Sequence, residues 1–172
     1  MASAIVMDLM SLKELCDHLN YSRQVDLPIE LERLDRLTRS AVSRYKNEAS
    51  NFPEIRNKFL TFHNLFVTHL RKETEEFFPF IRQWLASDQE ALSLRSSLQT
   101  WISEFREEHS RSDETLAELQ AFIRKQPINP STSQTARLIA QSVDRLDKLL
   151  QEQIYKENQM LFPRILAFGK TG

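Results

Sequence analysis

The amino-acid sequence predicts an all-α protein, an antiparallel four-helix bundle with up-down-up-down topology. Apolar residues recur at steps of three and four over long segments, which turns one face of each helix toward a shared core. The connections between these segments are short, so neighbouring helices run antiparallel. The 172 residues include two glycines, Gly169 and Gly172, so the chain lacks the tight glycine turns that many-stranded β folds favour.

The first helix is expected at about residues 12–46. Ser11 and Glu14 have the spacing of a capping box at its start, in which each residue satisfies a backbone N–H of the other. Pro28 lies inside this segment and predicts a bend or an interruption before it.

The second helix is expected at about residues 52–86. Asn51 and Glu54 fit a variant of the capping box, and Pro53 lies in the first turn, where a missing N–H is harmless.

The third and fourth helices are expected at about 88–125 and 132–167. Ser87 with Glu90 marks the start of the third helix, and the proline-containing segment 126–131 separates it from the fourth. The apolar stripes comprise, in chain order, Leu27, Leu31 and Leu34; Ile55, Phe59, Phe62 and Phe66; Leu94, Leu98, Ile102 and Phe105; Leu116, Leu119 and Ile123; and Ile139, Val143, Leu146 and Leu150. We expect a single domain over residues 1–172.

Composition excludes several classes of protein. Phosphate-binding loops and the nucleophile elbow of serine hydrolases need glycine, so a P-loop NTPase, a Rossmann domain and an elbow hydrolase are excluded. The 23 basic and 24 acidic residues are interspersed, unlike the basic surface of a nucleic-acid-binding protein. The one cysteine, Cys16, excludes an internal disulfide and a cysteine-rich zinc site. Neither a signal peptide nor a membrane span is predicted, so we expect a cytoplasmic protein.

An internal repeat carries the chemistry of the chain. Residues 69–81 read HLRKETEEFFPFI, and residues 153–165 read QIYKENQMLFPRI. The repeat pairs Lys72 with Lys156, Glu73 with Glu157, Phe78 with Phe162, Pro79 with Pro163 and Ile81 with Ile165. The first copy begins His-x-x-x-Glu and the second Gln-x-x-x-Glu, and this spacing places both residues of each pair on one helix face.

These polar residues continue the apolar stripes into the core. The stripe of the second helix leads to His69 and Glu73, and that of the fourth leads to Gln153 and Glu157. The stripe of the third helix leads to His109. Counted from the connecting segments, these positions lie within about one helical turn of the same height. A buried carboxylate needs a cation, a proton or hydrogen-bond donors, so imidazole and carboxylate converging there predict a transition-metal site, preferably for iron.

The motifs around this site resemble those of the hemerythrin-like cation-binding family, in the branch near the di-iron proteins that repair iron–sulfur clusters. The resembling motifs are His69-x-x-Lys72-Glu73 running into Phe77-Phe78-Pro79, the Glu108-His109 pair, and Lys156-Glu157-Asn158 running into Leu161-Phe162-Pro163-Arg164. The resemblance implies a four-helix bundle that holds two non-haem irons. Its ligands would be a His of helix one, His-x-x-x-Glu of helix two, a His of helix three and His-x-x-x-Glu of helix four, with bridging carboxylates.

By this resemblance, the ligands are His69, Glu73, His109 and Glu157, and the cofactor is non-haem iron, as one or two ions. The fourth-helix His of the family is replaced by Gln153.

On the first helix the stripe reaches Asn20 where the family would have His. His18 is two positions away, and it is a ligand only if the helix is broken before Pro28. A di-iron site, a single metal ion and an empty site all remain open. The remaining polar residues near the site, Glu75, Glu76, Glu107, Glu108 and Glu114, are expected to be solvated, with Glu76 as a reserve ligand, and His63 is expected at the rim.

Two functions fit this site. The first is a hemerythrin-like iron protein that binds O2 or NO, or stores and delivers iron under oxidative or nitrosative stress, since a ligand-poor site leaves open positions for a diatomic molecule. The second is a metal-free bundle that acts as an interaction or regulatory module. An enzyme is the less favoured interpretation. Oxidase chemistry is not expected, because Arg106 stands where the Glu-x-x-His of ferritin-type oxidases would place its Glu before His109. The expected partners are a metal ion and O2 or NO, with a second copy of the chain as a further candidate.

Overall fold

Every element of the computed structural model is a helix, over the residues that it describes: 4–23, 25–47, 50–86, 92–126 and 133–168. The elements in chain order are α1 (Ala4–Leu9), α2 (Leu12–Arg23), α3 (Asp26–Arg44), α4 (Phe52–Lys72), the π-helical turn η1 (Glu73–Phe77), α5 (Phe78–Ala86), α6 (Leu92–Arg124), α7 (Ser133–Tyr155), the π-helical turn η2 (Lys156–Leu161) and α8 (Phe162–Phe168). The all-α prediction is therefore confirmed for these residues.

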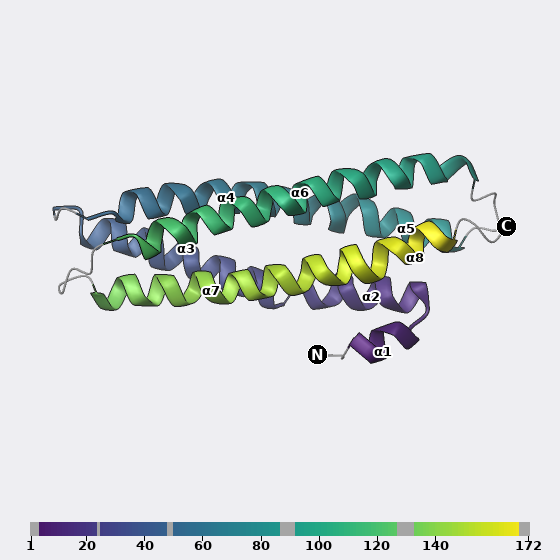
Figure 1. Ribbon diagram of the computed structural model, residues 1–172, viewed down its shortest axis with the longest axis horizontal. Helices are drawn as coiled ribbons and strands as arrows, with labels where there is room; N and C mark the ends of the chain where they lie inside the picture. The colour runs from purple at the N-terminus through teal and green to yellow at the C-terminus, as the bar shows by residue number, and fades with distance from the viewer. Residues whose placement is uncertain (1–3, 24, 48–49, 87–91, 127–132, 169–172) are drawn as a thin grey trace.

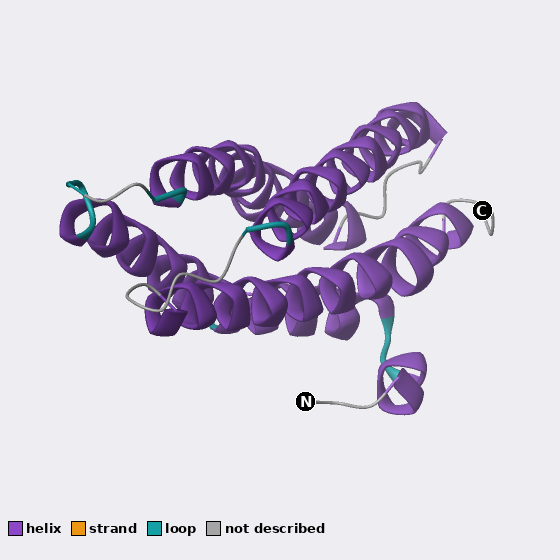
Figure 2. Ribbon diagram, turned by 60° about the vertical axis from the view of Figure 1, so that its left-hand side comes forward, coloured by secondary structure: helices purple, strands orange, loops and turns teal. Residues whose placement is uncertain are grey.

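The long helices lie side by side as an elongated bundle (Figure 1). α4 packs along α6 and α3 packs along α7, while α3 also contacts α4 and α6 contacts α7. The short α1 lies beside the bundle, next to the N-terminus, and Figure 2 shows it displaced from the long helices. Arg164 of α8 holds it there by donating to the backbone carbonyls of Met7, at 3.4 Å, and Met10.

The first predicted helix is interrupted before Pro28, as expected. α2 ends at Arg23 and α3 begins at Asp26, so Pro28 lies in the first turn of α3, where a helix does not need its N–H. The capping box at the start of α2 is also confirmed. The Ser11 N–H donates to Glu14 Oε2 at 2.7 Å, and the Glu14 N–H donates to Ser11 Oγ at 3.2 Å.

The capping prediction for the second helix holds for the position and fails for the hydrogen bond. Asn51 is the N-cap residue of α4, but its side chain makes no cap hydrogen bond with the start of the helix. The amide of Asn51 donates to the side chain of Gln126. Pro53 lies in the first turn of α4, as expected. The third predicted capping box, Ser87 with Glu90, lies outside the described residues.

Two apolar clusters fill the interior, one on either side of the polar residues that continue the apolar stripes. We call these polar residues the seam residues: His69, Glu73, His109, Gln153 and Glu157. The first cluster gathers buried residues of α2, α5, the first half of α6 and α8, including Leu15, Ile102 and Phe162. The second gathers those of α3, α4, the second half of α6 and α7, including Leu34 and Phe62. The polar seam residues therefore lie in mid-bundle, with apolar packing above and below them.

Each copy of the internal repeat contains a π-helical turn that the sequence analysis does not predict. In the first copy, the Phe78 N–H bonds to the Glu73 carbonyl, five residues back. The residue after Phe78 is Pro79, whose ring would collide with the carbonyl four residues earlier in a regular α-helix. The wider π turn removes this conflict, and such turns occur often at functional sites. The second copy repeats the arrangement from Glu157 to Phe162.

Candidate metal centre

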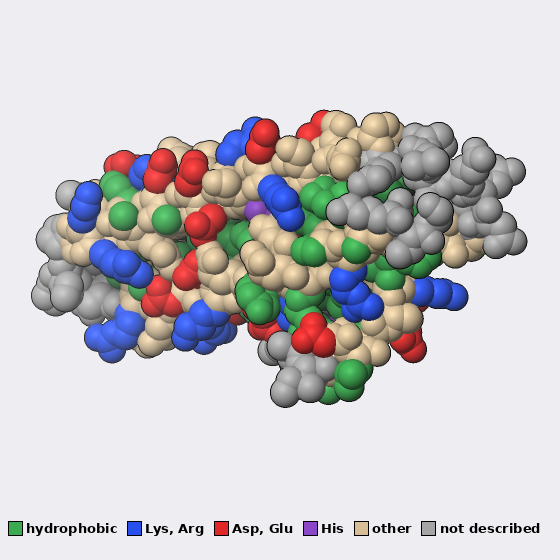
Figure 3. Space-filling view, turned by 45° about the vertical axis from the view of Figure 1, so that its right-hand side comes forward, with side chains coloured by type: hydrophobic (Ala, Val, Ile, Leu, Met, Phe, Trp, Pro, Cys, Tyr) green, Lys and Arg blue, Asp and Glu red, His purple; other side chains and the backbone are tan. Residues whose placement is uncertain are grey.

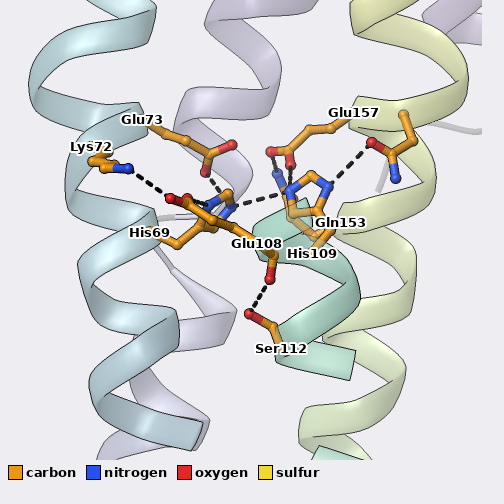
Figure 4. A network of polar contacts seen from close by, with 9 residues as sticks. His69, Lys72, Glu73, Glu108, His109, Ser112, Gln153 and Glu157 are labelled. Carbon is orange, nitrogen blue, oxygen red and sulfur yellow. Dashed lines mark hydrogen bonds and ion pairs between the residues drawn. The ribbon is translucent and has the colours of Figure 1, made fainter. Parts of the chain in front are cut away.

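Four buried side chains converge in mid-bundle: His69 of α4, Glu73 of η1, His109 of α6 and Glu157 of η2 (Figure 4). Each offers one ligand atom, and these atoms all lie within 4.8 Å of one another. None of the four residues is more than 2% exposed. This geometry agrees with the prediction that polar residues from three helices lie at the same height along the bundle.

The two imidazoles face each other through their Nε2 atoms. His69 Nε2 lies 3.1 Å from His109 Nε2. Each Nε2 also lies near a carboxylate, since His69 Nε2 is 3.3 Å from Glu73 Oε2 and His109 Nε2 is 3.0 Å from Glu157 Oε2. Two nitrogens and two oxygens therefore surround one point.

The other nitrogen of each ring faces an oxygen acceptor. His69 Nδ1 lies 2.8 Å from Glu108 Oε2, and His109 Nδ1 lies 3.2 Å from Asn158 Oδ1. An acceptor at Nδ1 places the proton of the neutral imidazole there and directs the Nε2 lone pair into the centre. This is the arrangement in which histidines bind metal ions, with the far nitrogen hydrogen-bonded to a carboxylate or another oxygen.

Glu108 is an outer partner of the centre, and the prediction that it is solvated is wrong. Its side chain is 12% exposed, and Lys72 Nζ donates to its Oε1 at 2.6 Å. The hydrogen bond from His69, together with the hydrogen bond and charge of Lys72, outweighs the effect of burial and lowers the pKa of Glu108 to about 2. The hydrogen bond to Glu108 in turn raises the pKa of Lys72. Glu108 is thus a carboxylate at neutral pH, and its hydrogen bond with Nδ1 makes His69 a stronger metal ligand through Nε2.

Two signals in the sequence point to this pair. Lys72 follows His69 by three residues, which places both on one face of α4. Glu108 directly precedes His109, so it flanks the stripe of its helix, which in the structure packs against α4.

Gln153 takes the position that His69 has in the first copy of the repeat. It is buried, and its Nε2 donates a hydrogen bond to Glu157 Oε1. An amide N–H has no lone pair for a metal, so Gln153 orients Glu157 through this donor.

Aromatic rings enclose the histidines. The Phe105 ring meets His69 edge-on at 5.4 Å between centroids, and Phe162 stacks on His109 at 6.1 Å with an angle of 8° between the planes. This packing fixes the orientation of the imidazole rings and surrounds the polar centre with apolar side chains. Electrostatic interactions within the centre are stronger in such surroundings. A small surface pocket of about 90 Å³ reaches Phe105 from outside. It is lined by Lys72, Glu76, Phe77, Trp101, Glu104 and Phe105.

The remaining predicted candidates lie outside the group. His18 is half-buried on α2, and His63 is half-buried on α4 beside Phe59. Asn20 is also half-buried, and its Oδ1 is buried with no hydrogen-bond partner within the described part of the chain. Glu76 is exposed and does not continue the seam, which passes from Glu73 to the buried residues Phe77 and Phe78.

The residues present fit a divalent metal ion. With both imidazoles neutral, Glu73 and Glu157 give the centre two negative charges, and Lys72 already balances Glu108. Buried carboxylates need such compensation, which a divalent cation supplies in full. Nitrogen and oxygen donors of this kind suit iron and its neighbours in the first transition series.

Comparison with known proteins does not assign the chain to a family. No model of a protein family matches the chain, and no curated protein sequence matches it significantly. Within the described residues, no helix combines the length and the apolar character needed to cross a membrane. Acidic and basic side chains alternate over the face shown in Figure 3, with no extended area of one sign on it.

Proposed function

We propose that this chain is a metal-binding protein whose buried centre holds iron, in an up-down-up-down four-helix bundle of the hemerythrin-like type. The observation that carries the proposal is the convergence of two imidazole Nε2 atoms and two carboxylates inside an apolar core. Lone pairs and negative charges directed at one point are unfavourable unless a cation or protons lie between them. The donor set suits iron, and the internal repeat and the Phe-Pro segments are similar to those of hemerythrin-like proteins.

The chain's own residues define what such a centre can do. His69, His109, Glu73 and Glu157 would hold the ion, and Glu108 and Asn158 would keep the two rings in position. The surrounding phenylalanines exclude bulk water. A bound ion would supply a Lewis-acidic position for a small ligand such as O2 or NO, as well as a means of storing iron. The pocket that ends at Phe105 has room for a molecule of that size.

The test is the thermal stability of the protein with and without Fe(II) under anaerobic conditions. An ion that binds the folded state at 100 times its Kd adds about 2.7 kcal/mol of stability, which corresponds to a rise in Tm of about 5–10 °C for a chain of this length. We expect this rise in the wild type and in His63→Ala, a histidine variant on the same helix outside the group. We expect it to be lost in His69→Ala.

A metal-free bundle that acts as an interaction or regulatory module is the second candidate. The hydrogen bonds of Gln153 to Glu157 and of His69 to Glu108 favour it, because they satisfy part of the seam without a metal. A Tm that does not respond to Fe(II) in the wild type would reject the iron proposal and support this one.

A further inference from the structure

We propose that the centre holds a single metal ion, bound by both imidazoles and by one oxygen each of Glu73 and Glu157, and that Gln153 positions Glu157 for this role. This inference rests on the proposed function, since it concerns the number of ions and their ligands at the same group. It departs from the pair of irons that the family resemblance implies.

The distances between the donor atoms carry the first step. Two neighbouring ligands on one ion, with bonds of about 2.0–2.2 Å, lie about 3 Å apart. The two Nε2 atoms are 3.1 Å apart, and each lies 3.0–3.3 Å from a carboxylate oxygen. Two ions in a dinuclear site lie about 3.5–4 Å apart, so imidazoles bound to different ions would have nitrogens at that separation or beyond. The imidazoles of His69 and His109 are therefore spaced to share one ion.

The second step concerns the contacts of the two carboxylate oxygens of Glu157. A carboxylate that bridges two ions with one oxygen on each needs both of its oxygens to face the centre. Glu157 Oε1 accepts the hydrogen bond from Gln153, and Oε2 is the oxygen that lies 3.0 Å from His109 Nε2. Gln153 thus directs one oxygen toward the centre and keeps the other engaged. At the matching position of the first repeat the chain has His69, an imidazole donor, so the two halves of the repeat are not equivalent.

The third step is the balance between the charge of the ligands and the charge of the bound ions. The two carboxylates of the group balance one divalent ion, and Glu108 is paired with Lys72. A second divalent ion would leave two positive charges uncompensated among phenylalanine rings, which is strongly unfavourable.

The number of ions is tested by loading the full-length protein with Mn(II), measuring bound metal per chain, and recording its electron paramagnetic resonance spectrum. We expect one ion per chain and the hyperfine pattern of an isolated Mn(II). Two ions per chain with an exchange-coupled spectrum would overturn the single-ion proposal while supporting metal binding itself. No bound metal, with Fe(II) tested in the same way, would overturn both the proposed function and this inference.

The positioning role is tested with Gln153→Met, which preserves the volume of the side chain and removes its donor. We expect the Kd for Mn(II) to rise about 10- to 100-fold, as for other outer partners of metal ligands, with one ion still bound. Gln141→Met, at an exposed position of the same helix, is the matched control and should leave the Kd unchanged. Circular dichroism verifies that both variants are folded. A folded Gln153→Met protein with the wild-type Kd would overturn the role of Gln153.

Discussion

Replacing Glu108 by glutamine is expected to weaken metal binding about 10- to 100-fold without altering the fold. Glu108 stands behind His69, accepting from its Nδ1 at 2.8 Å and from Lys72 Nζ at 2.6 Å. Glutamine has the same shape but no charge. One end of its amide can still accept from His69, while the other end directs an NH2 group at the Lys72 ammonium, so a favourable contact becomes a donor facing a donor.

The magnitude follows from the two hydrogen bonds. A hydrogen bond to a charged group contributes about 1.5–3 kcal/mol, and a neutral one about 0.5–1.5 kcal/mol. Neutralising the acceptor of His69 therefore costs about 1–1.5 kcal/mol, which is close to a tenfold change in affinity. The lost contact with Lys72 loosens the side chain further and extends the range toward 100-fold.

The assay is a competition titration of Fe(II) or Mn(II) against a chelating dye under anaerobic conditions. Glu107→Gln removes the same charge one residue away, at an exposed position, and controls for the change in net charge. A folded Glu108→Gln protein whose affinity stays within about twofold of that of Glu107→Gln would refute the reasoning, because an outer partner of a metal ligand typically affects affinity far more than this.

Three further predictions concern the rest of the bundle. Phe62→Ala empties a fully buried position and should lower the free energy of unfolding by about 3–5 kcal/mol in urea denaturation, and a loss below about 1 kcal/mol would contradict the packing. Burial raises the pKa of the Cys16 thiol to about 12, so a thiol reagent at pH 8 should label it only after denaturation, and rapid labelling of the native protein would be contrary to this. Burial raises the pKa of Asp35, but the hydrogen bond and charge of Arg56, together with the charges of Arg39 and His63, outweigh it and leave the pKa below its ordinary value. The stability that Asp35 contributes is therefore present above a pH of about 4 and is lost as the pH falls through the lowered pKa. The stability difference between wild type and Asp35→Asn should shrink from pH 5 to pH 2, and a constant difference would speak against the pairing.

The spacing of apolar residues predicts the centre because a regular α-helix has a constant number of residues per turn. Steps of three and four carry the seam of α4 from Phe59 to His69 and Glu73, and the structure buries all three. Beyond Glu73 the same count leaves two positions open, because a step of three leads to Glu76 and a step of four leads to Phe77. The structure buries Phe77 and leaves Glu76 exposed. The π turn also buries Phe78, five residues after Glu73, and a count of three and four cannot predict this step because it assumes a constant number of residues per turn.

Glu108 could not be found from the stripe of α6, because its position beside the seam is normal for a solvated residue. What buries it is a contact with another helix, through Lys72 and His69. The short α1 also escapes prediction, since six residues are too few to show a helical period. It is held by contacts with residues distant in the chain, since Met7 is buried in the first apolar cluster and its carbonyl accepts from Arg164, more than 150 residues away.

The claim that these four side chains bind a metal ion is tested most directly by diffraction from crystals of the iron-loaded protein, measured on both sides of the iron absorption edge. The account predicts one anomalous peak, about 2.0–2.2 Å from Nε2 of His69 and His109 and from a carboxylate oxygen of Glu73 and Glu157. Crystals saturated with iron that show no peak at this position, or a peak elsewhere in the bundle, would contradict it.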